Sequence, residues 1–436
     1  MEANKNIIDN LPDMMLAEIL VKIPLKSNTI VKLVCKRWKS LVESTIFRNH
    51  FLSLHQKKSC SWSVLHKHHI HVNTTHELIG FYGCEKWGLP RSLGSYISSP
   101  FSDAGIEIVS FIIKAISNGL LLILTQDYMI YVGNPVLREW VKIRPCTLSL
   151  KNYFQTQKFG LATRVDDENG VVLGYKVVLV NTRFENATNL TLQIYSSETG
   201  EWTCENVCCP CPIPWDSSPY PEPISVNGVL HWFGHGTINA GGIIAIDLYN
   251  ASPLRENHCW FIPFPNENLF VVDGKKSYKI WCRRACTTSE GFIMYINMVS
   301  ESKMKVWRLN KNYYEIESRE YWQLSSEIDL AHVDYGIGSI PIVMHPFDRN
   351  VVYLWSVEKS CLVSINMRDQ NSMLHKESEN YSDGCTISSL EKCKSYMEFR
   401  MDCFYKYLLI SPQFSPSVWM DSVPRPPIPL CVCCGR

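Results

Sequence analysis

A strand type that recurs at a nearly regular interval constrains the fold of this chain most. From about residue 76 onward, short runs rich in Val, Ile, Tyr, Phe and Trp alternate with Gly, Asn, Asp and Pro turns, which is typical of an all-β domain. The recurring strands begin about 53–63 residues apart, close to the kelch-like period of about 50. They start at Gly119, Tyr175, Gly228, Gly291, Val351 and Tyr407.

We therefore predict that residues 76–415 form a large all-β domain, a kelch-like β-propeller with six or seven blades. Each repeat has room for three or four strands, as a blade requires. An undivided pair of β-domains is the alternative. Trp140, Trp202 and Trp307 fall late in their repeats. We expect these rings to pack between blades and not to stack on a ligand, because they recur at equivalent places.

The N-terminal stretch from Leu11 to Phe47 has the period of amphipathic helices instead. Pro12 suits the first turn of a helix, and Pro24 ends that helix because the residue before a proline is driven out of the α region. Apolar residues recur on one helical face on both sides of Pro24. A motif of about 40 residues is near the lower limit for independent folding. Its apolar surface exceeds what it can bury alone, so we expect a partner protein.

The pattern of this helical stretch is specific. Its key positions are Leu11-Pro12, Ile19-Leu20, Ile23-Pro24, Val34, Lys36, Trp38, Leu41 and Phe47. With them, residues 8–50 resemble an F-box, although Asn28-Thr29 is polar where the motif is often apolar or rich in Ser and Leu. The resemblance implies docking on the Skp-type adaptor of cullin–RING ubiquitin ligases. The docking face expected from it is Leu11, Pro12, Leu16, Ile19, Leu20, Ile23, Pro24, Val34 and Trp38. An ordinary helical hairpin that belongs to the β-domain is the alternative.

The β-domain carries a second set of characteristic blocks. They are Asn118–Leu121, Gly133–Trp140, Phe159–Leu161, Tyr175–Val178, Tyr195–Trp202, Val226–Trp232 and Ile246-Asp247. With these blocks, residues 100–415 resemble the F-box-associated, kelch-related domain of plant-type F-box proteins. Asn118-Gly119 and Asn227-Gly228 are expected to supply the positive φ angles of tight turns. The resemblance implies a domain that binds a target protein.

Charge and composition narrow the class of protein. The net charge is +1, so nothing in the total calls for nucleic acid or an anionic membrane as a partner. Residues 1–60 hold ten Lys or Arg against five Asp or Glu, an excess that would steer the motif toward an acidic surface. We expect no signal peptide and no membrane span, and hence a protein of the nucleus, the cytoplasm or both. The 18 cysteines are then expected to be mostly reduced.

Two segments flank the β-domain. Residues 51–75 are predicted to be a linker, in which His66, His68, His69 and His71 would alternate between two faces of a strand. We therefore expect an exposed polar strand there and no zinc site, since zinc needs convergent ligands. The tail, residues 416–436, is rich in proline and cysteine and is predicted to be disordered or loosely attached.

An insert from Cys208 to Pro221 is predicted to be an exposed loop, because prolines are excluded from central strands. Its Trp215 and Tyr220 are speculative substrate-binding residues, since aromatic side chains on stiff loops often dominate binding. The opposing interpretation is that these rings strap the loop over the propeller. No metal is expected at its cysteines, because no second Cys or His pair lies at zinc-finger spacing.

No catalytic motif is visible. The sequence has no G-x-S-x-G elbow, P-loop, dinucleotide fingerprint or H-E-x-x-H, so we expect neither catalysis nor a cofactor. We predict a substrate receptor of an SCF-type (Skp–cullin–F-box) ubiquitin ligase. Its partners would be a Skp-type adaptor, through it cullin and RING subunits, and a protein or glycoprotein target. The alternative is a ligase-independent scaffold that binds protein or glycan. A helix-turn-helix DNA binder is disfavoured because Trp38 and Leu41 are needed for packing.

Overall fold

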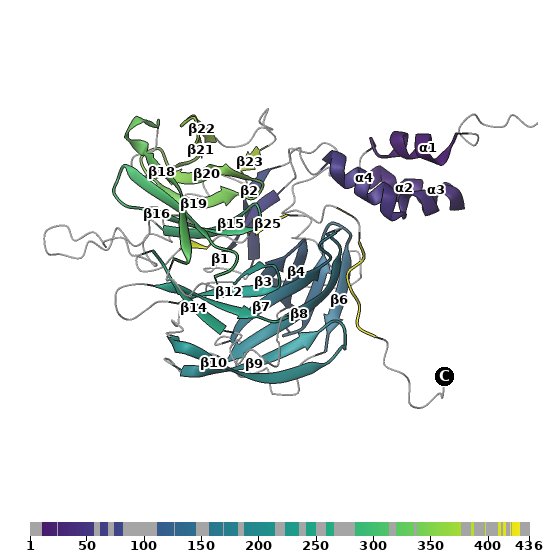
Figure 1. The fold of residues 1–436 in the computed structure, drawn as a ribbon, viewed down its shortest axis with the longest axis horizontal. Coiled ribbons are helices and arrows are strands. Elements are labelled where there is room, and N and C mark those ends of the chain that lie inside the picture. The colour runs from purple at the N-terminus through teal and green to yellow at the C-terminus, as the bar shows by residue number, and fades with distance from the viewer. Residues whose placement is uncertain are drawn as a thin grey trace, which may run out of the picture.

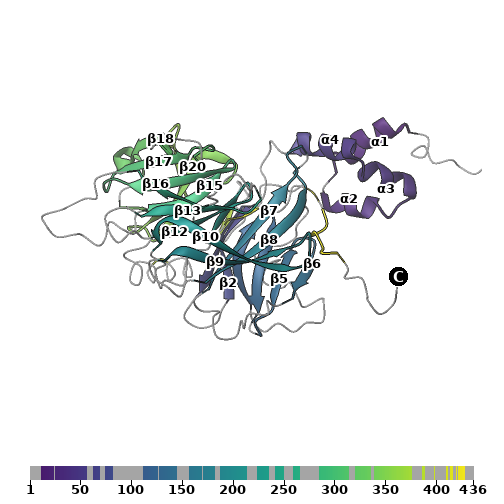
Figure 2. The same cartoon turned by 60° about the horizontal axis from the view of Figure 1, so that its bottom comes forward.

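A computed structural model places four short helices to one side of a set of β-sheets (Figure 1 and Figure 2). The structure describes residues 11–23, 25–55, 62–68, 74–81, 111–125, 127–144, 157–168, 170–181, 187–213, 223–234, 241–249, 259–265, 284–313, 320–334, 338–375, 385–387, 397, 409–410, 413–415, 419 and 421–427. None of the helices in these ranges is long and apolar enough to cross a bilayer.

The helical part has its own core. Its helices are α1 (Asp13–Leu20), α2 (Leu25–Val31), α3 (Lys36–Val42) and α4 (Thr45–His55). The Cys35 sulfur accepts a hydrogen bond from the Trp38 amide at 3.5 Å, and the Ser44 hydroxyl accepts one from the Phe47 amide at 3.2 Å. These contacts satisfy amides at the starts of α3 and α4 that have no partner within the helix. The buried core is Leu16, Leu20, Val21, Val31, Val42, Phe47, Phe51 and one distant residue, Trp419.

Five sheets follow one another along the described chain, each with four consecutive antiparallel strands, and the fourth carries one additional strand at its edge. The first blade is β3 (Phe111–Ser117), β4 (Leu120–Thr125), β5 (Ile130–Asn134) and β6 (Glu139–Ile143). The second is β7 (Gln157–Val165), β8 (Val172–Asn181), β9 (Ala187–Ser196) and β10 (Trp202–Ile213). The third is β11 (Ile224–Val226), β12 (Val229–Gly234), β13 (Gly242–Asp247) and β14 (Cys259–Pro263).

The last two of these blades are joined by a short 3-10 helix, η6 (Leu330–His332). The fourth blade is β15 (Arg284–Ser289), β16 (Phe292–Met298), β17 (Lys303–Leu309) and β18 (Trp322–Asp329). The fifth is β19 (Ile340–His345), β20 (Asp348–Ser356), β21 (Cys361–Asn366) and β22 (Ser372–His375).

A further sheet, the closing sheet, combines strands from both ends of the β-domain. Its order is β23 (Cys385–Ile387), β2 (Thr74–Phe81), β1 (Trp62–His68) and β25 (Gln413–Phe414). Trp62 of β1 belongs to the core shared with the fourth and fifth blades, and Phe414 of β25 belongs to the core of the first blade. Shared cores also join the first blade to the second, the second to the third and the third to the fourth. The sheets therefore form one closed propeller, which rules out two separate β-domains.

The predicted count of six or seven blades is corrected, because the residues that the structure describes form five blades of consecutive strands. Five of the six recurring strands lie one to a blade, and in each case the recurring strand is the second strand of its blade. The sixth, at Tyr407, leads to β24 (Leu409–Ile410), which pairs in parallel with β15 at the edge of the fourth blade and starts no blade. The β-domain also begins earlier than predicted, at Trp62 inside the expected linker, because β1 and β2 lie in the middle of the closing sheet.

The predicted loop from Cys208 to Pro221 is corrected as far as Ile213, and the rest lies outside the described residues. Strand β10 continues through Pro210 and Pro212 to Ile213. It is the outermost strand of its sheet, where a missing N–H removes no ladder hydrogen bond. Its register shifts between Cys208 and Ile213, as expected where prolines interrupt pairing.

The predicted turns are confirmed. Asn118 and Gly119 have φ angles of 44° and 77°, and Asn227 and Gly228 have 51° and 78°. Each pair joins the first strand of a blade to the second. Positive φ at both central positions is what a tight hairpin turn requires, and Asn and Gly adopt it at the least cost.

The tryptophans pack as predicted, with one change of position. Trp140 and Trp202 lie at the beginning of the fourth strand of their blades, as the second and the first residue. Trp307 lies in a third strand, and Trp322 takes the equivalent place in the fourth blade. The Trp202 indole donates to the Arg144 carbonyl at 2.8 Å, and the Trp322 indole donates to the Pro263 carbonyl at 2.8 Å. Both acceptors lie at the end of the preceding blade, so these rings join neighbouring blades.

Candidate functional site

Exposed apolar side chains are concentrated on the helices. Among the described residues, fourteen large apolar side chains are exposed, and eight of them lie between Met14 and Leu54. These eight are Met14, Met15, Ile19, Ile30, Leu33, Val34, Ile46 and Leu54. Leu33 is 84 % exposed. Apolar surface of this kind, on so short a stretch, marks a protein-interaction face.

The structure separates the predicted docking residues into two groups. Ile19, Val34 and Pro12 are exposed and remain available to a partner. Leu16 and Leu20 are buried in the helical core, so we correct their expected role from docking to packing. Leu11, Ile23 and Trp38 are half-buried, and Pro24 lies outside the described residues.

The sequence interpretation missed several exposed apolar residues. They are Met14, Met15, Ile30, Leu33 and Ile46. Leu33, for example, lies two residues beyond the end of α2 and is exposed. The number of apolar residues in this stretch was the informative feature, because four short helices cannot bury them all.

An arginine holds the start of α1 in place. The Arg37 guanidinium lies 2.8 Å from the Asp13 carboxylate, and it also donates to the Leu11 carbonyl. Asp13 lies in the first turn of α1, where a carboxylate also interacts favourably with the helix dipole. Arg37 thereby fixes α1 against α3.

The first strands of the blades are joined by a hydroxyl network. The Ser117 hydroxyl lies 2.8 Å from that of Thr163 and donates to that of Ser225 at 3.0 Å, which joins the first three blades. On the other side of the ring, the Gln413 carboxamide accepts from the Thr288 hydroxyl at 2.5 Å and donates to the Met344 carbonyl at 2.7 Å. These groups satisfy one another and hold the propeller closed.

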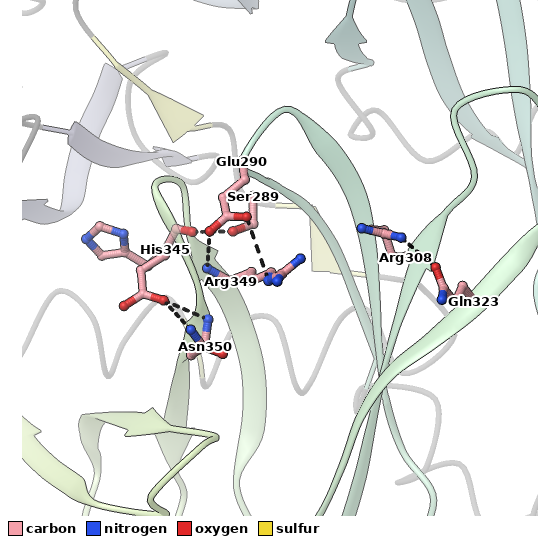
Figure 3. Close-up of polar contacts among 8 residues, drawn as sticks. Ser289, Glu290, Arg308, Gln323, His345, Arg349 and Asn350 are labelled. Atoms are coloured by element: carbon pink, nitrogen blue, oxygen red, sulfur yellow. Dashed lines mark hydrogen bonds and ion pairs between the residues drawn. The ribbon is translucent and has the colours of Figure 1, made fainter. Parts of the chain in front are cut away.

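Polar side chains also gather where the turns of the fourth and fifth blades meet (Figure 3). The Ser289 hydroxyl donates to the His345 carbonyl at 2.7 Å, and the Arg349 guanidinium lies 3.8 Å from the Glu290 carboxylate. Within the fourth blade, the Arg308 guanidinium on β17 donates to the Gln323 carboxamide on β18 at 2.5 Å (Figure 3). The first two pairs bridge the two blades, so the arrangement fixes the turns.

Two histidines of the propeller have hydrogen-bonded rings: His231 is buried on β12, and His345 is half-buried at the end of β19. The His345 Nε2 lies 3.2 Å from the Trp62 indole N–H, and its Nδ1 lies 3.2 Å from the Phe347 N–H. A neutral imidazole has one acceptor nitrogen, so the ring accepts from one of these donors at a time. His231 lies 3.2 Å from the Ile224 carbonyl and 3.3 Å from the Tyr313 hydroxyl. Burial lowers the pKa of each histidine to about 4. Both rings are therefore neutral near pH 7 and act as packing and hydrogen-bonding groups.

Some of the residues predicted to be functional lie outside the part of the chain that the structure describes. Trp215, Tyr220, His69 and His71 lie outside the described residues. In the parts of the chain that the structure describes, no group of three or more His, Cys, Asp or Glu is placed to hold a metal ion. The speculative substrate-binding role of Trp215 and Tyr220 stays a prediction.

Comparison with known proteins agrees with this architecture. Residues 8–50 match the F-box domain, and residues 60–425 match the family described as "F-box protein At3g26010-like, beta-propeller". Three Arabidopsis thaliana relatives align over nearly the whole chain. F-box protein At3g28330 is 37 % identical, covering 93 % of this chain and 94 % of its own length. F-box protein At3g26010 is 35 % identical, covering 97 % of this chain and 92 % of its own length. F-box protein At1g49990 is also 35 % identical, covering 94 % of this chain and 97 % of its own length.

Proposed function

Because the chain belongs to the F-box proteins with an At3g26010-like β-propeller, we propose that it is the substrate-recognition subunit of an SCF-type ubiquitin ligase. The F-box would dock on a Skp-type adaptor and, through it, on cullin and RING subunits. The propeller would hold a target protein. The expected site of action is the nucleus, the cytoplasm or both.

One observation carries this proposal. The helices keep Leu16, Leu20 and Phe47 for their own core and leave apolar side chains such as Leu33 and Val34 in solvent. Exposure of that much apolar surface is unfavourable by roughly 25 cal/mol per Å² until a partner covers it. A Skp-type adaptor would provide that cover, and the basic excess of residues 1–60 would favour an acidic partner.

The chemistry would occur on other subunits. A receptor of this kind raises the effective concentration of a target lysine near the ubiquitin-charged enzyme, which requires no reactive side chain on the receptor itself. Target choice would depend on surface turns and loops, where side chains vary without disturbing the blades. The exposed Phe347, beside the Ser289–His345 contact, is one such position.

Adaptor binding is tested with an acidic double variant. Leu33→Asp with Val34→Asp places two charges in the exposed apolar face, and we expect the affinity for a purified Skp-type adaptor to fall about tenfold or more. The matched control is Leu173→Asp with Leu324→Asp, because both leucines are exposed on the propeller. Equal affinity of the F-box variant and the control variant would refute the docking face.

Target recognition is tested in cells with the proteasome blocked. Proximity labelling with the full chain is compared with labelling by a chain that lacks residues 1–55. Proteins labelled by both, and ubiquitinated only with the full chain, are the expected targets. If ubiquitination of the labelled proteins does not depend on residues 1–55, the chain acts as a scaffold and the ligase role is wrong.

A further inference from the structure

Part of the C-terminal segment is packed between the helices and the propeller. We define the C-terminal strap as residues 419–427, of which 419 and 421–427 are described. The Trp419 side chain is only 7 % exposed and lies in the core of the F-box helices. Its ring centroid is 5.2 Å from that of Phe51 and 6.2 Å from that of Phe47. For residues 419–427 this corrects the prediction of a disordered or loosely attached tail, because Trp419 completes the helical core, whereas residues 428–436 lie outside the described residues.

An ion pair fixes the strap beside this tryptophan. The Arg48 guanidinium donates two hydrogen bonds to the Asp421 carboxylate, at 2.8 and 2.6 Å. Both side chains are largely buried, at 11 % and 20 % exposed. The guanidinium also lies 5.8 Å from the centre of the Trp419 ring. A bidentate pair in a water-poor position is geometrically selective, so it specifies one placement of the strap on α4.

The other half of the strap is anchored on the propeller. Val423 is buried in the core shared by the first and second blades, and its amide donates to the Glu139 carboxylate at 2.9 Å. Pro426 lies against the β9–β10 turn, where a Cβ added to Gly200 would be 3.0 Å from the Pro426 Cβ. In Figure 1 the strap is the yellow segment that runs from the helices along β6.

The strap therefore bridges two units that the chain otherwise joins through residues 56–61, between α4 and β1. Trp419 and Asp421 bind one unit, and Val423 and Pro426 bind the other. Because only one residue separates Asp421 from Val423, the helix contact and the propeller contact cannot move far apart without breaking one of them.

We propose that the C-terminal strap holds the F-box at a set distance and orientation on the propeller, with Trp419 and Asp421 as positioning residues for ubiquitin transfer. The holding role stands on these contacts alone, whereas the effect on ubiquitin transfer rests on the proposed function. Transfer depends on the target lying within reach of the charged enzyme, so a loosened receptor would bind its adaptor normally and transfer ubiquitin less efficiently.

The direct test is a distance measurement within the full chain. Spin labels are attached through bio-orthogonal amino acids at two exposed positions, Lys39 on α3 and Glu205 on β10. We expect one narrow distance distribution for the parent chain, and a distribution at least twice as broad for Trp419→Ala and for Asp421→Ala. Ser422→Ala is the matched control, because Ser422 is the exposed neighbour of Asp421. An unchanged narrow distribution in both strap variants would overturn the proposal.

A charge exchange separates loosening from misfolding. Arg48→Asp alone and Asp421→Arg alone should each broaden the distribution, and the double variant should restore most of the narrow distribution, because the pair is re-formed with reversed polarity. Failure of the double variant to narrow the distribution, with the β-sheet circular dichroism spectrum intact, would count against the ion pair as the fixing contact.

Adaptor affinity and ubiquitin transfer are then measured on the same variants. We expect Asp421→Ala to bind a Skp-type adaptor within about twofold of the parent chain, while ubiquitination of a peptide fused to the propeller falls about fivefold or more. If the parent chain itself does not bind the adaptor, the ligase role fails while the distance result stands. If transfer is unchanged although the distribution broadens, the strap holds the F-box but does not position the target.

Discussion

The buried His231 and the half-buried His345 should make the propeller lose stability as pH falls from neutral to mildly acidic. His231 lies on β12 between the third and fourth blades, and His345 ends β19 against Trp62 of the closing sheet. Burial lowers the pKa of both to about 4, from the ordinary value of 6.5. Lowering the pH therefore favours protonation of each ring in the unfolded chain more than in the folded chain.

The sign and the magnitude of the change in the free energy of unfolding follow from the linkage between protonation and folding. Below pH 6.5 each histidine is protonated in the unfolded chain, but it remains neutral in the folded chain until pH 4. The unfolded state then binds more protons, so the free energy of unfolding is highest above pH 6.5 and falls as the pH drops toward 4. One pKa unit corresponds to about 1.36 kcal/mol. Between pH 7.5 and 5.0, each histidine should therefore remove about 2 kcal/mol.

Urea unfolding of the full chain at these two pH values measures the effect, with the free energy taken from linear extrapolation. His231→Gln and His345→Gln should each be less stable than the parent chain at pH 7.5, because their ring contacts are lost. Each should also lose about 2 kcal/mol less than the parent chain on going to pH 5.0. His332→Gln is the control, since His332 is exposed on η6. A drop for His231→Gln equal to that of the parent chain would refute the reasoning.

Two further predictions concern close contacts. Gly133→Ala should lower the free energy of unfolding by about 1–3 kcal/mol, because the added Cβ would lie 2.4 Å from the Glu139 carbonyl oxygen and from the Trp140 ring. Thermal unfolding measures this effect, and an unchanged melting temperature would contradict the prediction. Diamide should join Cys209 of β10 to Cys259 of β14, because the two buried sulfurs are 3.0 Å apart across the second and third blades. Mass spectrometry of the digested protein should find that cross-link, Cys209→Ser should remove it, and full alkylation of both thiols after oxidation would argue against it.

Local features of this protein were predictable because they leave a local pattern. The recurring strand near Gly119, Tyr175 and Gly228 lies at the second strand of successive blades. The Asn-Gly pairs form the turns that their positive φ angles favour. The F-box was identified from the spacing of apolar residues along short helices. In each case neighbours in the sequence are also neighbours in the fold, so periodicity is informative.

Errors arose where distant contacts override a local preference. Tyr407 begins a strand-like run, but that run pairs in parallel at the edge of β15 instead of starting a blade. Prolines suggested a loop at Pro210, but the edge position of β10 tolerates them. Leu16 and Leu20 share a helical stripe with Ile19, yet packing buries the first two and leaves the third in solvent.

The sequence alone determined a helical motif with more apolar surface than it can bury and a β-domain made of repeated units of three or four strands. Only the tertiary structure decided how the ring closes and how the helices sit on it. Arg48 and Asp421 are 373 residues apart, and Trp62 meets His345 across 283 residues. Contacts at such separations impose no spacing on the sequence between them. They depend on the surfaces that the helices and the blades expose after they have folded, and side-chain packing determines those surfaces.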